Sequence, residues 1–224
     1  MKSIEEFENK IICGDCFEAM KEIPDNNVDL ILTDPPFNLG VKSYDIKKDD
    51  YFHWYDKVAK ELYRILKHKS SILVETSYIY LFETMNVLNQ YFIWRQPIIC
   101  YITNGMRRTS FCGWGRYQIY LWYGKGHTVV RKRLYDLIPV TLISSKRDFK
   151  YPNPKFVDFY EKLIAMFSKK DDIVLDPFLG SGTTAIACKK LNRRYIGIEI
   201  SPEYCKIAEE RIRNIIITKN EKFW

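Results

Sequence analysis

The sequence predicts an α/β fold with a doubly wound, mainly parallel sheet. Short apolar segments of strand length alternate along the chain with longer segments in which apolar residues have helical spacing. Two of the apolar segments, 28–33 and 173–175, are expected to be buried strands of a parallel sheet that helices cover on both faces. With 224 residues and a hydrophobic content of 46%, the chain suits one domain with a full core.

The predicted strands are short and end at turns or loops. The segment 28–33 follows a turn at 24–27 and reads Val-Asp-Leu-Ile-Leu-Thr, and the segment 117–123 ends at Gly-Lys-Gly. In chain order, the predicted strands lie at 11–13, 28–33, 71–74, 94–102, 117–123, 173–175 and 195–198.

The predicted helices carry apolar residues three or four positions apart. The first places Phe17, Met20 and Ile23 on one face, and the last begins with Ser201 as N-cap and Pro202 at the first helical position. In chain order, the predicted helices lie at 17–23, 51–66, 78–88, 156–167, 184–191 and 202–215.

Positive charge is concentrated in the middle of the chain. The whole chain has a net charge of +7 and a pI near 8.9, and the segment 105–150 alone carries +8. Two segments in this region, 104–115 and 132–151, have no periodic pattern and are predicted to be irregular. Charge runs are often only solvated surface, but a basic middle between near-neutral blocks favours a nucleic-acid partner.

Several classes of protein are disfavoured by simple patterns. No apolar run reaches the roughly 18 residues that a membrane helix needs, and the first ten residues lack the apolar stretch of a signal peptide. Of the six cysteines, only Cys13 and Cys16 have C-x-x-C spacing, and no second close pair follows. We therefore expect no membrane partner, no metal site, and thiols in a reducing compartment.

A glycine-rich loop follows the strand 173–175 and opens a predicted helix. It reads D-P-F-L-G-S-G-T-T from Asp176, and the helix N-terminus would favour an anion such as a carboxylate. Glu199 ends the next strand, 23 positions after Asp176, close to the spacing at which an acid binds a ribose diol. No Lys follows the last Gly, which disfavours a nucleotide triphosphatase. The loop alone still leaves open a nicotinamide cofactor, with Ala185 at the third glycine position, or no ligand at all.

A second loop, Asp34-Pro35-Pro36-Phe37, follows the strand 28–33. An exocyclic amine on adenine or cytosine is a poor nucleophile because its lone pair is delocalised into the ring. The Asp34 carboxylate can accept one of its N–H groups and the Pro35 carbonyl the other, while two prolines stiffen the backbone. Phe37 offers a ring on which a flipped-out base can stack. With a sulfonium methyl as electrophile, positioning and desolvation are enough to carry the rate.

Together, these segments resemble the amino-group DNA methyltransferases that use S-adenosylmethionine. The segment 34–37 matches the catalytic D-P-P-[YF] motif of that family, and the segment 176–184 matches its D-P-F-x-G-S-G-T-T cofactor motif. Similarity extends over nearly the whole chain, including 193–199 and the region from Pro202 to Arg211. The resemblance implies a Rossmann-like methyltransferase fold, a single domain at 1–224 and S-adenosylmethionine as cofactor.

The order of the two motifs narrows the resemblance. The catalytic motif comes first, as in the permuted beta class, in which the target-recognition region lies between the motifs. This order implies a small basic target-recognition insertion at approximately 104–150. D-P-P in place of S-P-P favours adenine N6 over cytosine N4, so the implied activity is site-specific methylation of adenine N6 in DNA, in a restriction–modification system or alone.

The resemblance also implies roles for individual residues. The implied catalytic residues are Asp34, Pro35, Pro36 and Phe37. The implied cofactor contacts are Asp15, Cys16, Lys155, Asp176, Phe178, Gly180, Ser181, Gly182, Thr183, Glu199 and Ile200. Lys155 belongs to a segment that keeps the Pro and Lys of the H-P-x-x-K-P motif but has Tyr and Phe in place of His and the last Pro. The residues expected to contact DNA, at guanine edges or at phosphates, are Lys42, Arg107, Arg108 and Arg116.

Two other functions remain open from the sequence. One is methylation of cytosine N4 or of RNA, and the other is a catalytically silent DNA-binding subunit, against which the intact segment 34–37 argues. The implied partner is double-stranded DNA, and a homodimer and a companion restriction endonuclease are left open. The implied location is cytoplasmic and nucleoid-associated, in a prokaryotic or viral setting.

Overall fold

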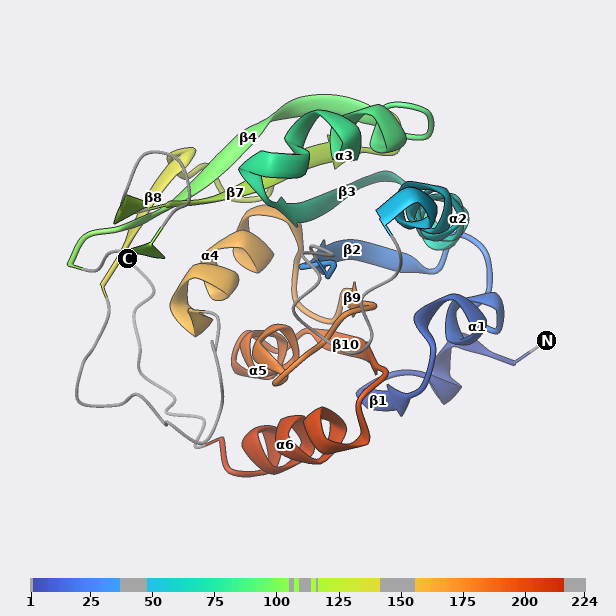
Figure 1. The fold of residues 1–224 in the computed structure, drawn as a ribbon. Coiled ribbons are helices and arrows are strands. Elements are labelled where there is room, and N and C mark those ends of the chain that lie inside the picture. Colours follow the sequence, from blue (N-terminus) through green and yellow to red (C-terminus); the bar gives the residue numbers. More distant parts are fainter. Residues whose placement is uncertain are drawn as a thin grey trace.

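The computed structural model describes residues 2–36, 48–104, 107–108, 114–115, 117–141 and 156–215. Its main sheet consists of β1 (Lys10–Cys13), β2 (Val28–Thr33), β3 (Leu66–Thr76), β4 (Ile93–Ile102), β7 (Tyr117–Gly124), β8 (Leu137–Val140), β9 (Ile173–Asp176) and β10 (Arg194–Glu199). The strand order is β1-β10-β9-β2-β3-β7-β4-β8 (Figure 1). Only β7 runs antiparallel to its neighbours in this sheet, so the predicted α/β fold with a mainly parallel sheet is confirmed.

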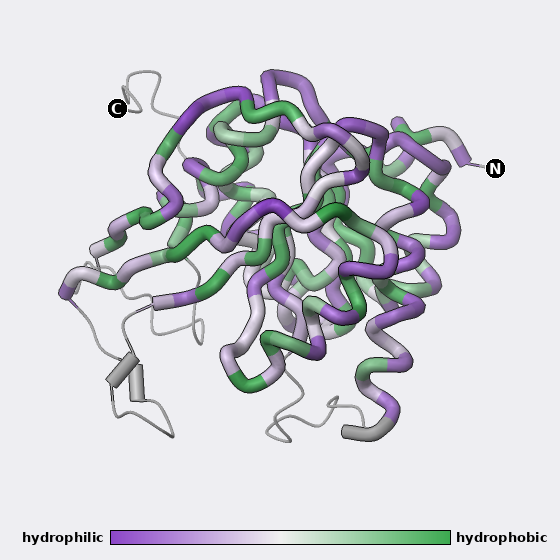
Figure 2. Tube along the Cα trace, turned by 90° about the horizontal axis from the view of Figure 1, so that it is seen from above, coloured by the Kyte–Doolittle hydropathy of each residue, from purple (hydrophilic) through white to green (hydrophobic). Residues whose placement is uncertain are grey.

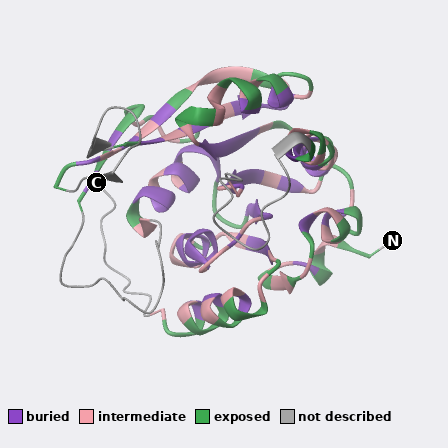
Figure 3. Cartoon of the chain, in the orientation of Figure 1, coloured by how far each residue is buried: buried purple, intermediate pink, exposed green. Residues whose placement is uncertain are grey.

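Helices cover both faces of the sheet (Figure 1). One face is covered by α1 (Cys16–Lys21), α2 (Lys48–Ile65) and α3 (Leu81–Leu88), and the other by α4 (Val157–Phe167), α5 (Thr183–Lys190) and α6 (Pro202–Arg213). Two short 3-10 helices, η1 (Ile4–Glu6) and η2 (Tyr78–Tyr80), precede β1 and α3. Buried residues follow the central strands and the inward sides of the helices (Figure 3), while hydrophilic residues gather on the outer turns (Figure 2).

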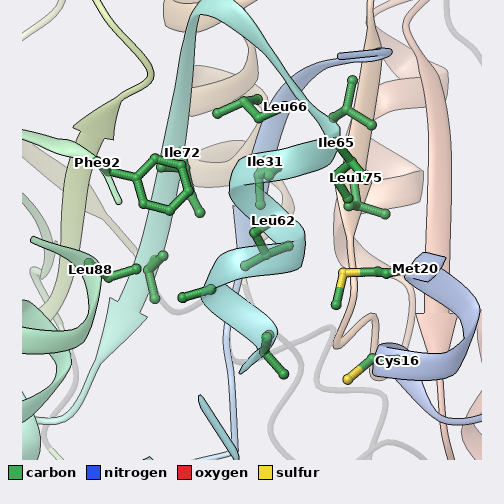
Figure 4. Packing of buried hydrophobic residues seen from close by; sticks show 14 of the residues in the cluster. Cys16, Met20, Ile31, Leu62, Ile65, Leu66, Ile72, Leu88, Phe92 and Leu175 are labelled. Atoms are coloured by element: carbon green, nitrogen blue, oxygen red, sulfur yellow. The ribbon is translucent and has the colours of Figure 1, made fainter. Parts of the chain in front are cut away.

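The central strands are apolar on both sides because each side meets its own core. On β2, Val28 and Ile31 belong to one buried cluster and Leu30 and Leu32 to the other. Leu62 of α2 packs into the first cluster, together with residues of β2, β3 and β9 (Figure 4). This two-sided burial explains why the segment 28–33 is almost continuously hydrophobic in sequence.

Some elements differ from those that the sequence predicts. The segment 132–151 was expected to be irregular, which is wrong for β8 at Leu137–Val140. This strand lies at the edge of the sheet, where Pro139 can replace a residue with an N–H without breaking the ladder. The segment 104–115 contains the short antiparallel pair β5 (Arg107–Arg108) and β6 (Trp114–Gly115). Apart from these two short strands, the expected insertion at 104–150 is described at Asn104 and from Tyr117 to Thr141.

The pairing of β2 with β9 positions the two loops of interest. These strands are parallel, with Leu30 opposite Val174 and Ile31 opposite Leu175. Because parallel strands present their carboxyl ends at the same edge, the loops that begin at Asp34 and Pro177 leave the sheet side by side. None of the helices in the described part of the chain is long and apolar enough to cross a membrane.

At the opposite edge of the sheet, a buried lysine links several elements by hydrogen bonds. Lys125, which follows β7 and is only 4% exposed, donates from Nζ to Asn26 Oδ1 at 2.9 Å and to the carbonyls of Tyr63 and Leu66 at 2.6 and 2.8 Å. The two carbonyls belong to the end of α2 and the start of β3, where a cation is favoured by the helix dipole. Lys125 therefore joins the β7 end to the α2–β3 junction.

Replacing this lysine should destabilise the fold. Lys125→Met removes three hydrogen bonds and leaves buried acceptors unsatisfied, so we expect the free energy of unfolding to fall by about 2–4 kcal/mol. Urea unfolding followed by circular dichroism measures the change. Lys57→Met, at an exposed lysine of α2, is the control and should stay within about 0.5 kcal/mol of wild type. Equal stabilities of the two variants would contradict the role of Lys125.

Candidate active site

A hydrogen bond joins the ends of the two central strands. Thr33, the last residue of β2, donates from Oγ1 to Asp176 Oδ1, the last residue of β9, at 2.9 Å. Both side chains are buried, Thr33 completely and Asp176 to 4% exposure. The segment that leads to Asp34 and the glycine-rich loop are therefore held to each other at one edge of the sheet.

Asp176 organises the glycine-rich loop from within. Besides Thr33, it accepts hydrogen bonds from the Thr184 hydroxyl and from the Phe178 backbone N–H, the latter at 3.1 Å. Burial raises the pKa of Asp176 to about 6, and the charge of Glu199 adds to this, while the three hydrogen bonds oppose it. Asp176 thus lies beneath the loop and fixes the path of its backbone. The family motif alone does not indicate this structural role.

Two glycines in the loop have positive φ for different purposes. Gly182, with φ of 88°, is the N-cap residue of α5, and a Cβ there would lie 2.9 Å from the Cβ of Ala208 on α6. Gly182 therefore permits close packing of the loop on α6. Gly180, with φ of 55°, has an open side, because a Cβ there would meet only the Phe178 carbonyl oxygen at 4.0 Å. A ligand can approach the backbone at Gly180.

Arg211 of α6 secures the middle of the same loop. Its Nη1 donates to Ser181 Oγ at 2.7 Å and to the Ser181 carbonyl. Thr183, the first residue of α5, is buried, and Phe178 is partly buried with its ring centroid 5.8 Å from that of Trp54 on α2. These contacts connect the loop to α6 and α2.

Glu199 ends β10 with its carboxylate held beside the glycine-rich loop. Its Oε2 accepts from the Gly180 N–H at 2.8 Å, and its Oε1 accepts from the Ser201 N–H at 2.9 Å. Each carboxylate oxygen can accept more than one hydrogen bond, so the oriented carboxylate keeps acceptor capacity for a diol. The adjacent Ile200 is 54% exposed, which leaves an apolar side chain at this edge.

Asp15 and Cys16 lie next to Glu199 at the end of β1. Cys13 pairs with Glu199 in the ladder, and the Gly14 N–H donates to the Glu199 carbonyl at 2.9 Å. Asp15 is the exposed N-cap of α1 and accepts from the Glu18 N–H at 3.0 Å. The Cys16 side chain is buried in the core beneath α1 (Figure 4), and burial raises the pKa of its thiol to about 12. Cys16 can therefore offer a ligand its backbone but not its thiol.

The loop after β2 is held by a residue that the sequence did not single out. The Tyr51 hydroxyl donates to the Pro36 carbonyl at 2.7 Å. Tyr51 itself is 6% exposed and stacks on Tyr55, with 6.0 Å between the ring centroids. Asp34 and Pro36 are partly buried and Pro35 is buried. In sequence, Tyr51 is one more apolar position of a helix, so only its contact with the Pro36 carbonyl reveals it.

Part of the predicted site lies in segments that the structure does not describe. Phe37, Lys42, Arg116 and Lys155 lie outside the described residues, and of Arg107 and Arg108 only the backbone in β5 is described. The described cofactor-site candidates do converge on one sheet edge: Asp15 and Cys16 follow β1, the residues from Asp176 to Thr183 follow β9, and Glu199 and Ile200 end β10. Asp34 lies beside them across the β2–β9 pair.

The chain is similar in sequence to DNA-modifying enzymes. A family described as DNA methylase matches residues 28–142 and 122–210. The Type II methyltransferase M.HpaI of Haemophilus parainfluenzae is 32% identical over 241 residues, which cover 92% of this chain and 74% of that protein. M.HinfI of Haemophilus influenzae is 30% identical over 263 residues, covering 98% of this chain and 72% of its own length.

Solved structures show the same fold. A complex of M1.HpyAVI with SAM has a TM-score of 0.70 and 28% identity, with coverage of 91% of this chain and 98% of that one. The cytosine-N4-specific PvuII DNA methyltransferase has a TM-score of 0.78 at 20% identity, covering 93% of this chain and 88% of that one. Because this identity is low, the likeness to the PvuII enzyme is evidence for the fold and not for the activity.

The buried charge of Asp176 should cost stability in a pH-dependent way. A carboxyl whose pKa is raised on folding holds its proton more tightly in the folded state, so wild type loses stability as pH rises from about 4 to about 6. Asp176→Asn has no such charge and should be more stable than wild type by about 2 kcal/mol near pH 8, with the difference vanishing near pH 4.

Urea unfolding of both proteins across this pH range measures the difference. Asp136→Asn, at an exposed aspartate, is the control for loss of a surface charge and should show little pH-dependent gain. A stability difference for Asp176→Asn that stays constant between pH 4 and 8 would show that the carboxylate is not penalised by burial.

Proposed function

This chain belongs to the family of DNA methylases that act on amino groups at N6 or N4, and we propose that it methylates adenine N6 in DNA with S-adenosylmethionine. The proposal rests on the position of two loops, which lie side by side at one sheet edge. The loop with Asp34, suited to an exocyclic amine, begins on the strand next to the glycine-rich loop, and the Thr33–Asp176 hydrogen bond joins them.

Asp34 would act on the target amine. When bound, S-adenosylmethionine supplies a methyl group on a positively charged sulfur. Positive charge would develop on the amine nitrogen as this nitrogen takes up the methyl group and the bond from the methyl carbon to sulfur breaks. The Asp34 carboxylate accepts an amine N–H, stabilises this charge and stands where the released proton leaves. Tyr51 fixes the Pro36 carbonyl and thereby the direction of the Pro35–Pro36 backbone.

The residues around Glu199 fit S-adenosylmethionine. The oriented Glu199 carboxylate suits the ribose hydroxyls, and the open side at Gly180 allows close approach to the backbone. The exposed Ile200 offers an apolar surface for the adenine ring, beside the backbone of Asp15 and Cys16. Lys155 is proposed to hold the methionine end on the strength of its motif.

Double-stranded DNA is the proposed substrate. The basic segment at approximately 104–150 would form the target-recognition insertion of the permuted beta class, with Lys42, Arg107, Arg108 and Arg116 on bases or phosphates. Adenine is proposed over cytosine because the motif at Asp34 is D-P-P. A companion restriction endonuclease is proposed because M.HpaI and M.HinfI are named Type II methyltransferases.

Product analysis tests the proposed function. DNA from cells that express the chain, and DNA incubated with purified protein and labelled S-adenosylmethionine, should contain N6-methyladenine when digested to nucleosides and analysed by mass spectrometry. Recovery of N4-methylcytosine alone would overturn the adenine assignment. An absence of label in DNA would favour a catalytically silent subunit.

Two variants should separate chemistry from cofactor binding. Asp34→Ala removes the acceptor for the amine, so kcat should fall at least about 100-fold while the Kd for S-adenosylmethionine changes little. Glu199→Ala removes the acceptor for the ribose hydroxyls and should raise that Kd about tenfold or more. Calorimetric binding and labelled-methyl transfer measure the two quantities. Near-normal kcat in the first variant, or unchanged Kd in the second, would refute the corresponding role.

A further inference from the structure

A second buried acid lies beside Asp34. Thr33 of β2 pairs with Val74 of β3 in a parallel ladder, so the next residues, Asp34 and Glu75, reach the same sheet edge together. Leu32 and Leu73 both belong to the core beneath α4 and α5, and side chains two positions apart share a face. Asp34 and Glu75 therefore project on the same side of the sheet. Glu75 is only 3% exposed.

Neutral donors hold the Glu75 carboxylate in place. Gln118 donates from Nε2 to Oε1 at 2.6 Å, and the Tyr120 hydroxyl donates to Oε2 at 2.6 Å. Tyr120 lies opposite Glu75 in the β3–β7 ladder, and its hydroxyl also lies 3.4 Å from that of Tyr160 on α4. An acid in an apolar core needs such donors, and neutral donors stabilise the carboxylate without cancelling its charge.

Glu75 and Asp34 act electrostatically on the same two tyrosines. Burial is the main cause that raises the pKa of Tyr120 and of Tyr160 well above its usual value, and the charges of Glu75 and Asp34 both add to this. Asp176 adds further to the effect on Tyr160. Asp34 and Glu75 thus act on the same hydroxyls, those of Tyr120 on β7 and Tyr160 on α4, and Glu75 is the acid on the strand next to β2.

We propose that Glu75 is a positioning residue for methyl transfer, whose carboxylate acts through Asp34 and strengthens Asp34 as the acceptor for the target amine. The negative charge of Glu75 makes Asp34 a stronger hydrogen-bond acceptor. It also adds negative potential at the amine nitrogen, where positive charge develops. This role rests on the proposed function, because it needs Asp34 to face the amine. Glu75 itself does not touch the substrate.

The pH dependence of kcat tests this role. A like charge disfavours ionisation of Asp34, so Glu75→Gln should move the acid limb of the kcat profile to lower pH by about one unit. Its plateau kcat should fall about tenfold, while the KM for S-adenosylmethionine stays within about threefold. Glu75→Asp keeps the charge and should keep the wild-type position of the acid limb.

A matched control separates this effect from the loss of any buried acid. Glu161 of α4 is also 3% exposed, but it pairs at 2.7 Å with Lys190 in the last turn of α5, toward the opposite edge of the sheet. Glu161→Gln should leave the acid limb in place. An unmoved acid limb in Glu75→Gln, or an equal movement in Glu161→Gln, would overturn the role of Glu75.

A measurement on wild type keeps the proposal testable even when Glu75→Gln does not fold. In ¹³C NMR, the side-chain carboxyl carbon of Asp34 should titrate in two steps if the Glu75 carboxyl acts on it across the β2–β3 pair. A single step would contradict the coupling. This titration needs no turnover. Absence of methyl transfer by wild type would therefore contradict the proposed function, whereas an active wild type with a single-step Asp34 titration contradicts the role of Glu75 alone.

Discussion

The parallel pairing of β2 with β9 is the constraint on which the site depends. Each strand is buried on both faces, so a slip of one residue would move its side chains into the opposite core and separate Thr33 from Asp176. The Thr33–Asp176 hydrogen bond then joins the strand ends, where Asp34 and the glycine-rich loop begin. A group bound by one loop therefore meets a group bound by the other, which is what a transfer reaction between two ligands requires.

Stability and function oppose each other at this sheet edge. Asp176 and Glu75 are acids in an otherwise apolar interior, and each is accommodated by hydroxyl or amide donors supplied from neighbouring elements. Such an arrangement is costlier to fold than an apolar core, but it presents charge and polar groups already oriented, so little reorganisation is needed during the reaction. The Arg211–Ser181 and Tyr51–Pro36 hydrogen bonds lie at the same sheet edge.

Much of the fold could be predicted because apolar periodicity reports burial directly. The sequence at 28–33 and 173–175 predicts two buried strands, and both form as β2 and β9. The strand β8 was missed because it is short and contains Pro139, which only the edge position tolerates. The contact of Tyr51 and the proposed role of Glu75 were missed for other reasons. Tyr51 looks like one more aromatic residue of an amphipathic helix, and Glu75 is a single acid in an apolar strand whose partners lie 43 and 45 positions away on β7.

In the proposed reaction, one sheet edge brings a sulfur-borne methyl group to an amine held by Asp34. A crystal structure of the protein with S-adenosylhomocysteine and a DNA duplex tests this arrangement. We expect the cofactor sulfur to lie between the Asp34 loop and the segment from Gly180 to Thr183, with the ribose hydroxyls on Glu199. The amino group of an extruded adenine should point to that sulfur from the Asp34 side. A cofactor or base bound away from this edge would refute the proposed arrangement.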